Sequence, residues 1–357
     1  MMRIRPRVLA LLLVSVLSAV MSACTSQGPT RLAPDRFDYN QAIARSANEQ
    51  MLLNLVRLRY SEIPVFLAVT SVLTQYSYAS TIGVRGSGGA SFGDPLWQVG
   101  ASGNFVYIER PTITYAPLTG DNFAKQLLKP IPSEMVFSLV SSGWPPRDLL
   151  LMTMFRLNDK LNMAFEMTPE AFERFDDFKL IVDQIIELAK RDAMEVEHGE
   201  ESKYLVFDQR TDPETRQLIA EFKTSMGLDA ELSKFRITHR HMDRKPDEVT
   251  MRVRSILELM GFLSRGVEIP PAHQEQNFAE KSTGWDDETP RRIPLHVHAQ
   301  VEPPQDAFVA IYFQDHWYYI AQSDHRSKKS FGLLEYLFQM QAPQLPTMGP
   351  LLTVPTG

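Results

Sequence analysis

Hydrophobic and polar residues alternate along two stretches near the start of the chain, residues 71–85 and 99–115. The apolar and aromatic positions recur at every second residue, the period at which side chains share one face of a β-strand. Residues 86–95, which are rich in Gly and Ser, separate the two stretches and predict a turn. We therefore expect a long β-hairpin. Its apolar face should hold Val72, Thr74, Tyr76, Tyr78, Ile82 and Val84 on the first arm and Val99, Ala101, Phe105, Tyr107, Ile113 and Tyr115 on the second.

The arms of this predicted hairpin lack charge. No Lys, Arg, Asp or Glu occurs between Glu62 and Arg85, or between Asp94 and Glu109. A strand in water usually carries charged residues, above all at a sheet edge, whereas strands of outer-membrane barrels resemble these arms. Three interpretations are open: a soluble sheet packed on helices, a barrel closed by hairpins of several subunits, and a sheet between subunits outside the membrane. The aromatic candidates for an interface on the arms are Tyr76, Tyr78, Phe105 and Tyr107.

Helical periodicity precedes the hairpin and recurs after it. In residues 38–60 an apolar stripe runs through Ile43, Ala47, Met51, Leu55 and Leu58 at spacings of four and three, which predicts an amphipathic helix. Further helices are predicted at residues 147–158, 175–191, 213–226, 247–263 and 328–341, and short strands at 194–198, 204–207, 234–240, 295–301 and 307–322. Helices and strands interleave without a regular βαβ order, which favours an α+β fold: an N-terminal helix and long β-hairpin, then interleaved helices and short antiparallel strands.

The same patterns suggest a division of the chain into segments. Residues 270–290 are polar and begin and end with proline, which predicts a linker. The segments are a signal peptide (1–23), a lipidated tether (24–34), the helix with the long hairpin (35–130), an α+β body (131–269), the linker (270–290) and a C-terminal β-hairpin with a helix (291–357).

The N-terminus has the features of an export signal. Three arginines, Arg3, Arg5 and Arg7, precede an apolar run at residues 8–21, which is shorter than the roughly 20 residues of a membrane-spanning helix. The sequence Met-Ser-Ala-Cys at 21–24 then resembles the lipobox of bacterial lipoproteins, with Met in place of the usual Leu. An ordinary secretory signal that happens to contain a cysteine is the alternative.

The lipobox resemblance implies that Cys24, the only cysteine, becomes the lipidated first residue of the mature chain. Thr25 follows it, and in that class a residue other than Asp implies the outer membrane, with the protein on its periplasmic face. Loss of residues 1–23 removes the three arginines and takes the formal net charge from −6 to −9. Because the remaining chain is acidic and has no basic patch with interleaved aromatic residues, we expect no nucleic-acid partner.

Candidate chemistry is sparse. The letters of residues 89–93, Gly-Ala-Ser-Phe-Gly, match the nucleophile motif of hydrolases, but that motif needs a strand-to-helix turn and no helix is predicted after Ser91. Two histidine pairs are spaced so that a strand would place each pair on one face, a geometry that can hold zinc. These weak metal candidates are His239, His241, His296 and His298. We otherwise expect no cofactor.

The C-terminal predicted hairpin is dense in aromatic residues, and Trp317 and Tyr319 are candidates for a surface that recognises a partner. Residues 53–60 (LNLVRLRY) and 110–115 (RPTITY) also make the chain similar to uncharacterised outer-membrane lipoproteins of Gram-negative bacteria, a resemblance that implies no activity. We expect a non-enzymatic lipoprotein with a structural or assembly role that oligomerises or inserts through its hairpin, with further copies or another envelope protein as partner. The alternatives are a subunit of an oligomeric β-barrel pore and a periplasmic hydrolase or metal-dependent enzyme.

Overall fold

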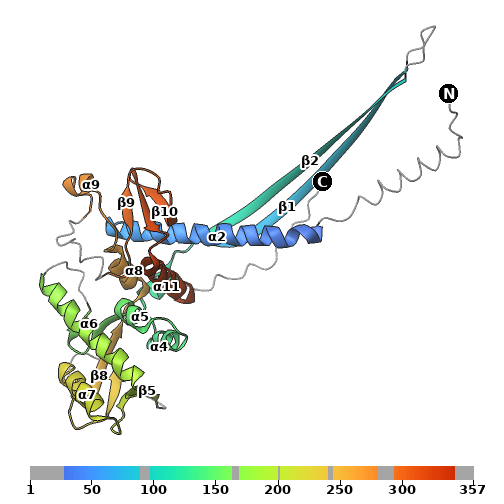
Figure 1. Ribbon diagram of the computed structural model, residues 1–357. Helices are drawn as coiled ribbons and strands as arrows, with labels where there is room; N and C mark the ends of the chain where they lie inside the picture. The colour runs from blue at the N-terminus through green and yellow to red at the C-terminus, as the bar shows by residue number, and fades with distance from the viewer. Residues whose placement is uncertain are drawn as a thin grey trace. The chain divides into compact units, whose positions relative to one another are not determined.

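The computed structural model describes residues 28–88, 97–162, 169–199, 202–239, 244–279 and 293–341 (Figure 1). The chain divides into two units, Met1–Glu49 and Gln50–Gly357. In chain order the elements are α2 (Gly28–Arg59), β1 (Leu67–Gly88), β2 (Trp97–Pro117), α3 (Asp121–Leu128), α4 (Ser133–Ser141), α5 (Pro146–Thr153), β3 (Met154–Leu157), β4 (Lys160–Leu161), α6 (Pro169–Lys190), β5 (Met194–His198), β6 (Lys203–Phe207), α7 (Pro213–Ser225), β7 (Lys234–Thr238), β8 (Glu248–Val253), α8 (Ile256–Ser264), α9 (Pro271–Glu275), β9 (His298–Gln300), β10 (Ala307–Phe313), β11 (His316–Ala321) and α11 (His325–Gln341).

Helix α2 confirms the helix predicted at residues 38–60 and begins earlier, at Gly28. Its apolar stripe is buried only toward the C-terminal end. Ile43 is half-buried and Ala47 is exposed, whereas Met51 and Leu55 are buried together with their neighbours Leu52 and Val56. The last two turns of α2 therefore belong to the hydrophobic core of the second unit.

Strands β1 and β2 confirm the long hairpin. They pair antiparallel from Leu67 opposite Pro117 to Gly88 opposite Trp97, with a single irregularity between Val69 and Ser71. Among the described residues these two strands form a sheet of their own and pair with no other strand.

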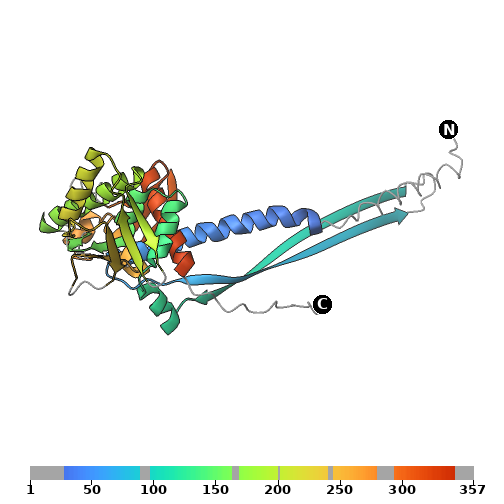
Figure 2. The same cartoon turned by 90° about the horizontal axis from the view of Figure 1, so that it is seen from below.

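The larger sheet has the strand order β4-β3-β8-β7-β6-β5, and all neighbours are antiparallel except the parallel pair β7 and β8. Helices α6 and α7 pack against each other, and α6 contacts strands β4 and β5 (Figures 1 and 2). The core beneath these helices contains the fully buried rings of Phe178, Phe222 and Phe235. Apolar burial of this extent is the main favourable contribution to folding.

Two sequence predictions are wrong in this region. Residues 247–263 do not form one helix, because Glu248–Val253 is strand β8 and only Ile256–Ser264 is helical, as α8. Ser255 begins α8 with a capping box, in which Ser255 and Glu258 each accept a hydrogen bond from the other's backbone N–H. Similarly, the helix predicted at residues 147–158 ends at Thr153, and Met154–Leu157 is strand β3.

A buried arginine holds the junction between α5 and β3. The guanidinium of Arg254 donates hydrogen bonds to the carbonyl oxygens of Leu151, Met152, Met154 and Asn162, at 3.2, 2.7, 3.0 and 2.8 Å. The bonds to Leu151 and Met152 satisfy carbonyl groups at the end of α5, which have no partner within the helix. Burial lowers the pKa of Arg254 to about 9.

The C-terminal sheet has the order β10-β11-β9. Gln314 and Asp315 form the turn between β10 and β11 with φ values of 44° and 62°, the left-handed conformation of a two-residue hairpin turn. Within the range predicted as a linker, Pro271–Glu275 forms the short helix α9 and His273 is buried. The observed mixture of an N-terminal helix, a hairpin, interleaved helices and mostly antiparallel sheets confirms the predicted α+β class.

Candidate functional site

The root of the β1–β2 hairpin is fixed by two amide side chains of α2. Asn54 donates to the carbonyl oxygen of Val65 (2.8 Å) and accepts from the N–H of Val65 (2.9 Å). One helical turn earlier, Gln50 donates to the carbonyl oxygen of Leu67 (3.1 Å) and accepts from its N–H (2.5 Å). Residues four apart on a helix lie on one face, and so do residues two apart on an extended chain. Each amide can therefore pair with both the N–H and the C=O of one residue, Asn54 with Val65 and Gln50 with Leu67. We call Gln50 and Asn54 the amide clamp.

The root is also packed against the core. Phe66 is buried between the two clamped residues, and its ring stacks on Phe338 of α11 at 4.6 Å and meets the edge of Phe123 of α3 at 5.7 Å. The N–H of Leu118 donates to the carbonyl oxygen of Phe66 at 2.9 Å, which joins the two arms where they leave the core. The hairpin therefore starts from a fixed position.

The ladder register brings the predicted apolar positions of both arms onto one face. Residues directly opposite each other in an antiparallel pair share a face. Tyr78 lies opposite Tyr107, and Val72 lies opposite Ile113. The other face carries mainly small or polar positions, such as Gln75 opposite Arg110 and Thr81 opposite Asn104, and is interrupted by Leu73, Val106 and Ile108.

The four aromatic interface candidates on the arms all fall on this apolar face. Tyr78 and Tyr107 are direct partners, Tyr76 lies opposite Glu109, and Phe105 lies opposite Ser80. Ser91, in the hydrolase-like letters of the predicted turn, lies outside the described residues.

The other two interface candidates lie on β11. Trp317 is half-buried and its ring packs beside Tyr312 at 5.4 Å. Tyr319 pairs with His298 across strands β11 and β9, and the two rings lie 5.2 Å apart. Tyr319 therefore lies next to one of the histidines considered as metal ligands.

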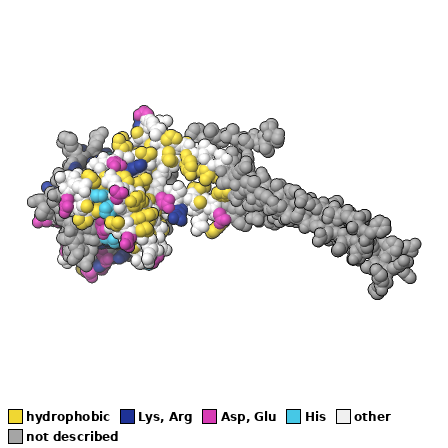
Figure 3. Space-filling view, turned by 90° about the horizontal axis from the view of Figure 1, so that it is seen from above, with side chains coloured by type: hydrophobic (Ala, Val, Ile, Leu, Met, Phe, Trp, Pro, Cys, Tyr) yellow, Lys and Arg dark blue, Asp and Glu magenta, His cyan; other side chains and the backbone are white. Residues whose placement is uncertain are grey.

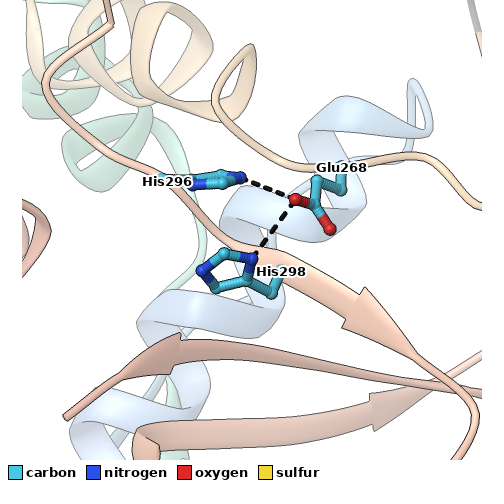
Figure 4. A group of neighbouring side chains, drawn as sticks. All are labelled: Glu268, His296 and His298. Carbon is cyan, nitrogen blue, oxygen red and sulfur yellow. Dashed lines mark hydrogen bonds and ion pairs between the residues drawn. The ribbon is translucent and has the colours of Figure 1, made fainter. Parts of the chain in front are cut away.

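The two histidine pairs have different surroundings. His239 lies near the carbonyl oxygen of Met251, with Nδ1 at 3.0 Å, and His241 lies outside the described residues. The second pair, His296 and His298, converges with Glu268 (Figure 4). His296 Nε2 lies 2.7 Å and His298 Nδ1 lies 3.2 Å from the same oxygen, Oε1 of Glu268.

The backbone around this group explains the convergence. Val297 is fully buried, so the residues on either side of it turn outward together. Val267 forms a parallel bridge with Val297, in which the N–H of Val297 donates to Gly266 (2.9 Å) and the N–H of Glu268 donates to Val297 (3.0 Å). A Cβ atom on Gly266 would lie 1.9 Å from the carbonyl oxygen of Leu295, so only glycine allows the two segments to approach this closely.

Hydrogen bonding keeps Glu268 ionised. Burial alone would raise the pKa of Glu268, but hydrogen bonds from His296, His298 and the N–H of Ala299 outweigh it and lower the pKa to about 2. The hydrogen bond to Glu268 raises the pKa of His298, against the opposite effect of burial. The sequence pattern identified the two histidines and missed Glu268, which lies in a loop with no distinctive motif.

A second polar cluster lies in the core beside α9. The hydroxyl of Tyr60 is 2.6 Å from His273 Nδ1 and 2.6 Å from the hydroxyl of Tyr318. Burial lowers the pKa of His273, and nearby His316 lowers it further, which favours a neutral ring that accepts from Tyr60. Tyr318 can then donate to the Tyr60 oxygen. Because these groups satisfy one another, the cluster supports packing.

Cys24, the predicted lipidation site, lies outside the described residues. Among the residues that the structure describes, no helix is both long and apolar enough to cross a membrane. No protein-family model matches the chain, and the searches of curated proteins and of solved structures return no match.

Proposed function

We propose that this protein is a lipid-anchored envelope protein that assembles into an oligomer by joining the β1–β2 hairpins of several copies. The observation that carries the proposal is a ladder of two strands, 22 and 21 residues long, that pair only with each other among the described residues. At about 3.3 Å per residue each arm is roughly 70 Å long. Two-stranded ribbons are marginal in water, and their outer edges carry unpaired N–H and C=O groups that favour pairing with further strands.

The described root of the hairpin adds an exposed apolar surface. Five apolar side chains there are open to solvent, namely Ile63, Val65, Leu67, Ile113 and Tyr115, with exposed fractions from 40% to 83%. Clustered exposed apolar residues mark interaction surfaces in soluble domains. A neighbouring copy that pairs along the strand edge would place its own side chains beside these and remove part of their surface from solvent.

Deletion of the hairpin tests the assembly. Residues 72–113 are replaced by Asn-Gly, which joins Ser71 to Thr114, two residues that already lie opposite each other. The variant keeps the amide clamp and the core, so we expect a folded single chain where the unmodified lipidated protein in detergent is an oligomer. An oligomer of unchanged size in the deletion variant would contradict the proposal.

A membrane-crossing role for the outer half of the hairpin is the second candidate, and the register favours it. From Ser77 opposite Ile108 to Gly88 opposite Trp97 the ladder carries one charged residue, Arg85, and its position lies on the small polar face. This window is about 40 Å long, or roughly 28 Å high at the ~45° tilt of membrane strands, which matches the hydrocarbon core of a bilayer. Because strand edges cannot stay unpaired in lipid, such insertion requires the oligomer.

Two adjacent residues at the middle of this window lie on opposite faces of the hairpin, so substitutions there test each face separately. Ile82 lies opposite Gly103 on the apolar face, and Thr81 lies opposite Asn104 on the small polar face. Lysine on a lipid-facing position costs about 2–4 kcal/mol per copy at the middle of the bilayer. We expect Ile82→Lys to abolish channel conductance in planar bilayers and Thr81→Lys to retain it with altered ion selectivity. Equal effects of the two substitutions would exclude the membrane-crossing role and leave the assembly proposal to be judged on oligomer size.

A further inference from the structure

We propose that Glu268, His296 and His298 form a binding site for one Zn²⁺ ion per chain. One ligand atom of each residue, an imidazole nitrogen or a carboxylate oxygen, lies within 4.8 Å of those of the other two. Two histidines and one glutamate are a donor set that zinc accepts, with Zn–N and Zn–O distances of about 2.0–2.2 Å. Small rotations of the three side chains would therefore bring their ligand atoms around one ion.

The arrangement is built from backbone constraints. Oε2 of Glu268 accepts the N–H of Ala299 at 2.9 Å, which turns Oε1 toward the two imidazoles (Figure 4). The N–H of His296 donates to the hydroxyl oxygen of Ser327 at 2.8 Å, and that hydroxyl donates to Asp324 at 2.6 Å. Hydrogen bonds that orient the groups around a metal in this way are typical of metal sites.

Both imidazoles lie within hydrogen-bond distance of the same oxygen, Oε1 of Glu268, and this contact shows which ring nitrogens carry a hydrogen. An ionised carboxylate only accepts, so each ring donates an N–H to Oε1 in the absence of an ion. When Zn²⁺ binds, each ring gives up that N–H and presents a nitrogen lone pair instead, and its remaining N–H lies on the other ring nitrogen. The ion then takes the position between the three groups that the two hydrogen bonds now occupy.

The chemistry of the donors favours zinc over calcium or magnesium. Imidazole nitrogen suits zinc and other late transition metals, whereas calcium and magnesium prefer sites made wholly of oxygen. The three side chains have exposed fractions between 21% and 32%, so an ion can reach them from solvent. On one face of the molecule histidine side chains are visible at the surface among acidic and hydrophobic ones (Figure 3). Three protein ligands leave a coordination position for water.

Isothermal titration of the full lipidated chain in detergent with ZnCl₂ at pH 7.5 tests the proposal. We expect saturation at one equivalent of Zn²⁺ per chain. Co²⁺ gives a second measurement, because its visible absorption bands report bound nitrogen and oxygen ligands. Cys24 is the only cysteine, and its lipidation would leave no thiolate to compete for the ion.

The decisive variant is Glu268→Gln, which has the same size and can still accept the N–H of Ala299. Glu268→Gln and His298→Ala, made separately, should each weaken zinc binding at least ~10-fold. That is the lower end of the loss seen when a residue that only supports a metal ligand is replaced. Two other histidines serve as matched controls: His239→Ala, from the first predicted pair, and His325→Ala, at an exposed position, should leave the affinity unchanged.

Three results would overturn the proposal: no zinc binding by the unmodified chain, binding that survives both site substitutions, or equal loss in the two control variants. Unchanged circular dichroism of Glu268→Gln separates loss of the ligand from loss of the fold. Binding is measured on each chain independently of oligomer size, so failure here leaves the hairpin proposal untouched, and failure of the hairpin proposal leaves this one untouched.

Discussion

Gly266 is the position where the structure makes its sharpest prediction about stability. A Cβ atom added there would lie 1.9 Å from the carbonyl oxygen of Leu295, 2.9 Å from its carbon and 3.2 Å from Cγ2 of Ile293. Carbon and oxygen atoms that touch across two backbone segments stay about 3.3 Å apart, so Gly266→Ala must separate the segments by ~1.4 Å.

That separation breaks the two hydrogen bonds that join Gly266 and Glu268 to Val297, at 2.9 and 3.0 Å. Each backbone hydrogen bond contributes about 1 kcal/mol net, and the packing of fully buried Val267 and Val297 suffers as well. We expect Gly266→Ala to lower the free energy of unfolding by about 2–4 kcal/mol. It should also weaken zinc binding, because it moves Glu268 away from the two histidines.

Gly332→Ala is the matched control for the same chemical change. Gly332 lies inside helix α11, and apart from its chain neighbours and the adjacent helix backbone no described atom lies within 4 Å of the added Cβ. Alanine is favoured over glycine in a helix by about 1 kcal/mol, so this variant should be as stable as the unmodified chain or more stable. Urea denaturation of both variants, followed by circular dichroism, measures the difference. If Gly266→Ala and Gly332→Ala unfold at the same urea concentration, the segments around Gly266 and Leu295 do not lie this close together.

Three further predictions concern the clamp, the core and pH. Asn54→Ala should lower the free energy of unfolding by about 2–4 kcal/mol. Asn54 is fully buried, and its loss leaves the N–H and the C=O of Val65 without their partners. Thermal unfolding measures the loss of stability. Tyr60→Phe should cost about 1–3 kcal/mol through its two lost hydrogen bonds, whereas Tyr312→Phe, at an exposed position, should change thermal stability by less than ~0.5 kcal/mol. Burial raises the pKa of Glu335 to about 7, above the 4.5 of an unburied glutamate, so the folded chain holds this proton more tightly than the unfolded chain. The contribution of Glu335 to stability is therefore fullest below about pH 4.5 and is lost as the pH rises through about 7. The loss in the free energy of unfolding should be about 1–3 kcal/mol. Unfolding experiments between about pH 4.5 and 8 should show that Glu335→Gln removes this part of the pH dependence.

The hairpin and its faces could be predicted from the sequence because strand periodicity is local and unusually long here. Alternation over two stretches gave the arms, and the register then placed both predicted apolar faces on one side of the ribbon, with Tyr78 opposite Tyr107. The residues that α2 contributes to the core could be predicted for the same reason, because apolar residues three and four apart are enough to identify one face of a helix.

Residues 247–263 show where periodicity fails. Val249 and Val253 are four apart, a spacing that fits both one face of a helix and alternate positions of a strand. Nearly all residues of β8 are buried because the strand lies inside the six-stranded sheet, which removes the polar alternation that would have revealed it. The capping box at Ser255 and Glu258 was the one local signal of the true helix start.

Two of the three residues of the metal-site candidate could be identified from the sequence. The His-x-His spacing identified His296 and His298, because residues two apart share a face on extended backbone. Glu268 joins them through a bridge between Val267 and Val297, segments about 30 residues apart that no local pattern connects. Contacts of this kind depend on the whole fold, as does the closeness that Gly266 allows.

The measurement that most directly tests the central claim is the native mass of the lipidated protein extracted in mild detergent, measured by native mass spectrometry. A single chain has a mass of 40.6 kDa before processing. We predict a particle that contains two or more processed chains and that falls to one chain when residues 72–113 are replaced by Asn-Gly. A particle of one chain in the unmodified protein would contradict the proposal that the β1–β2 hairpins assemble the oligomer.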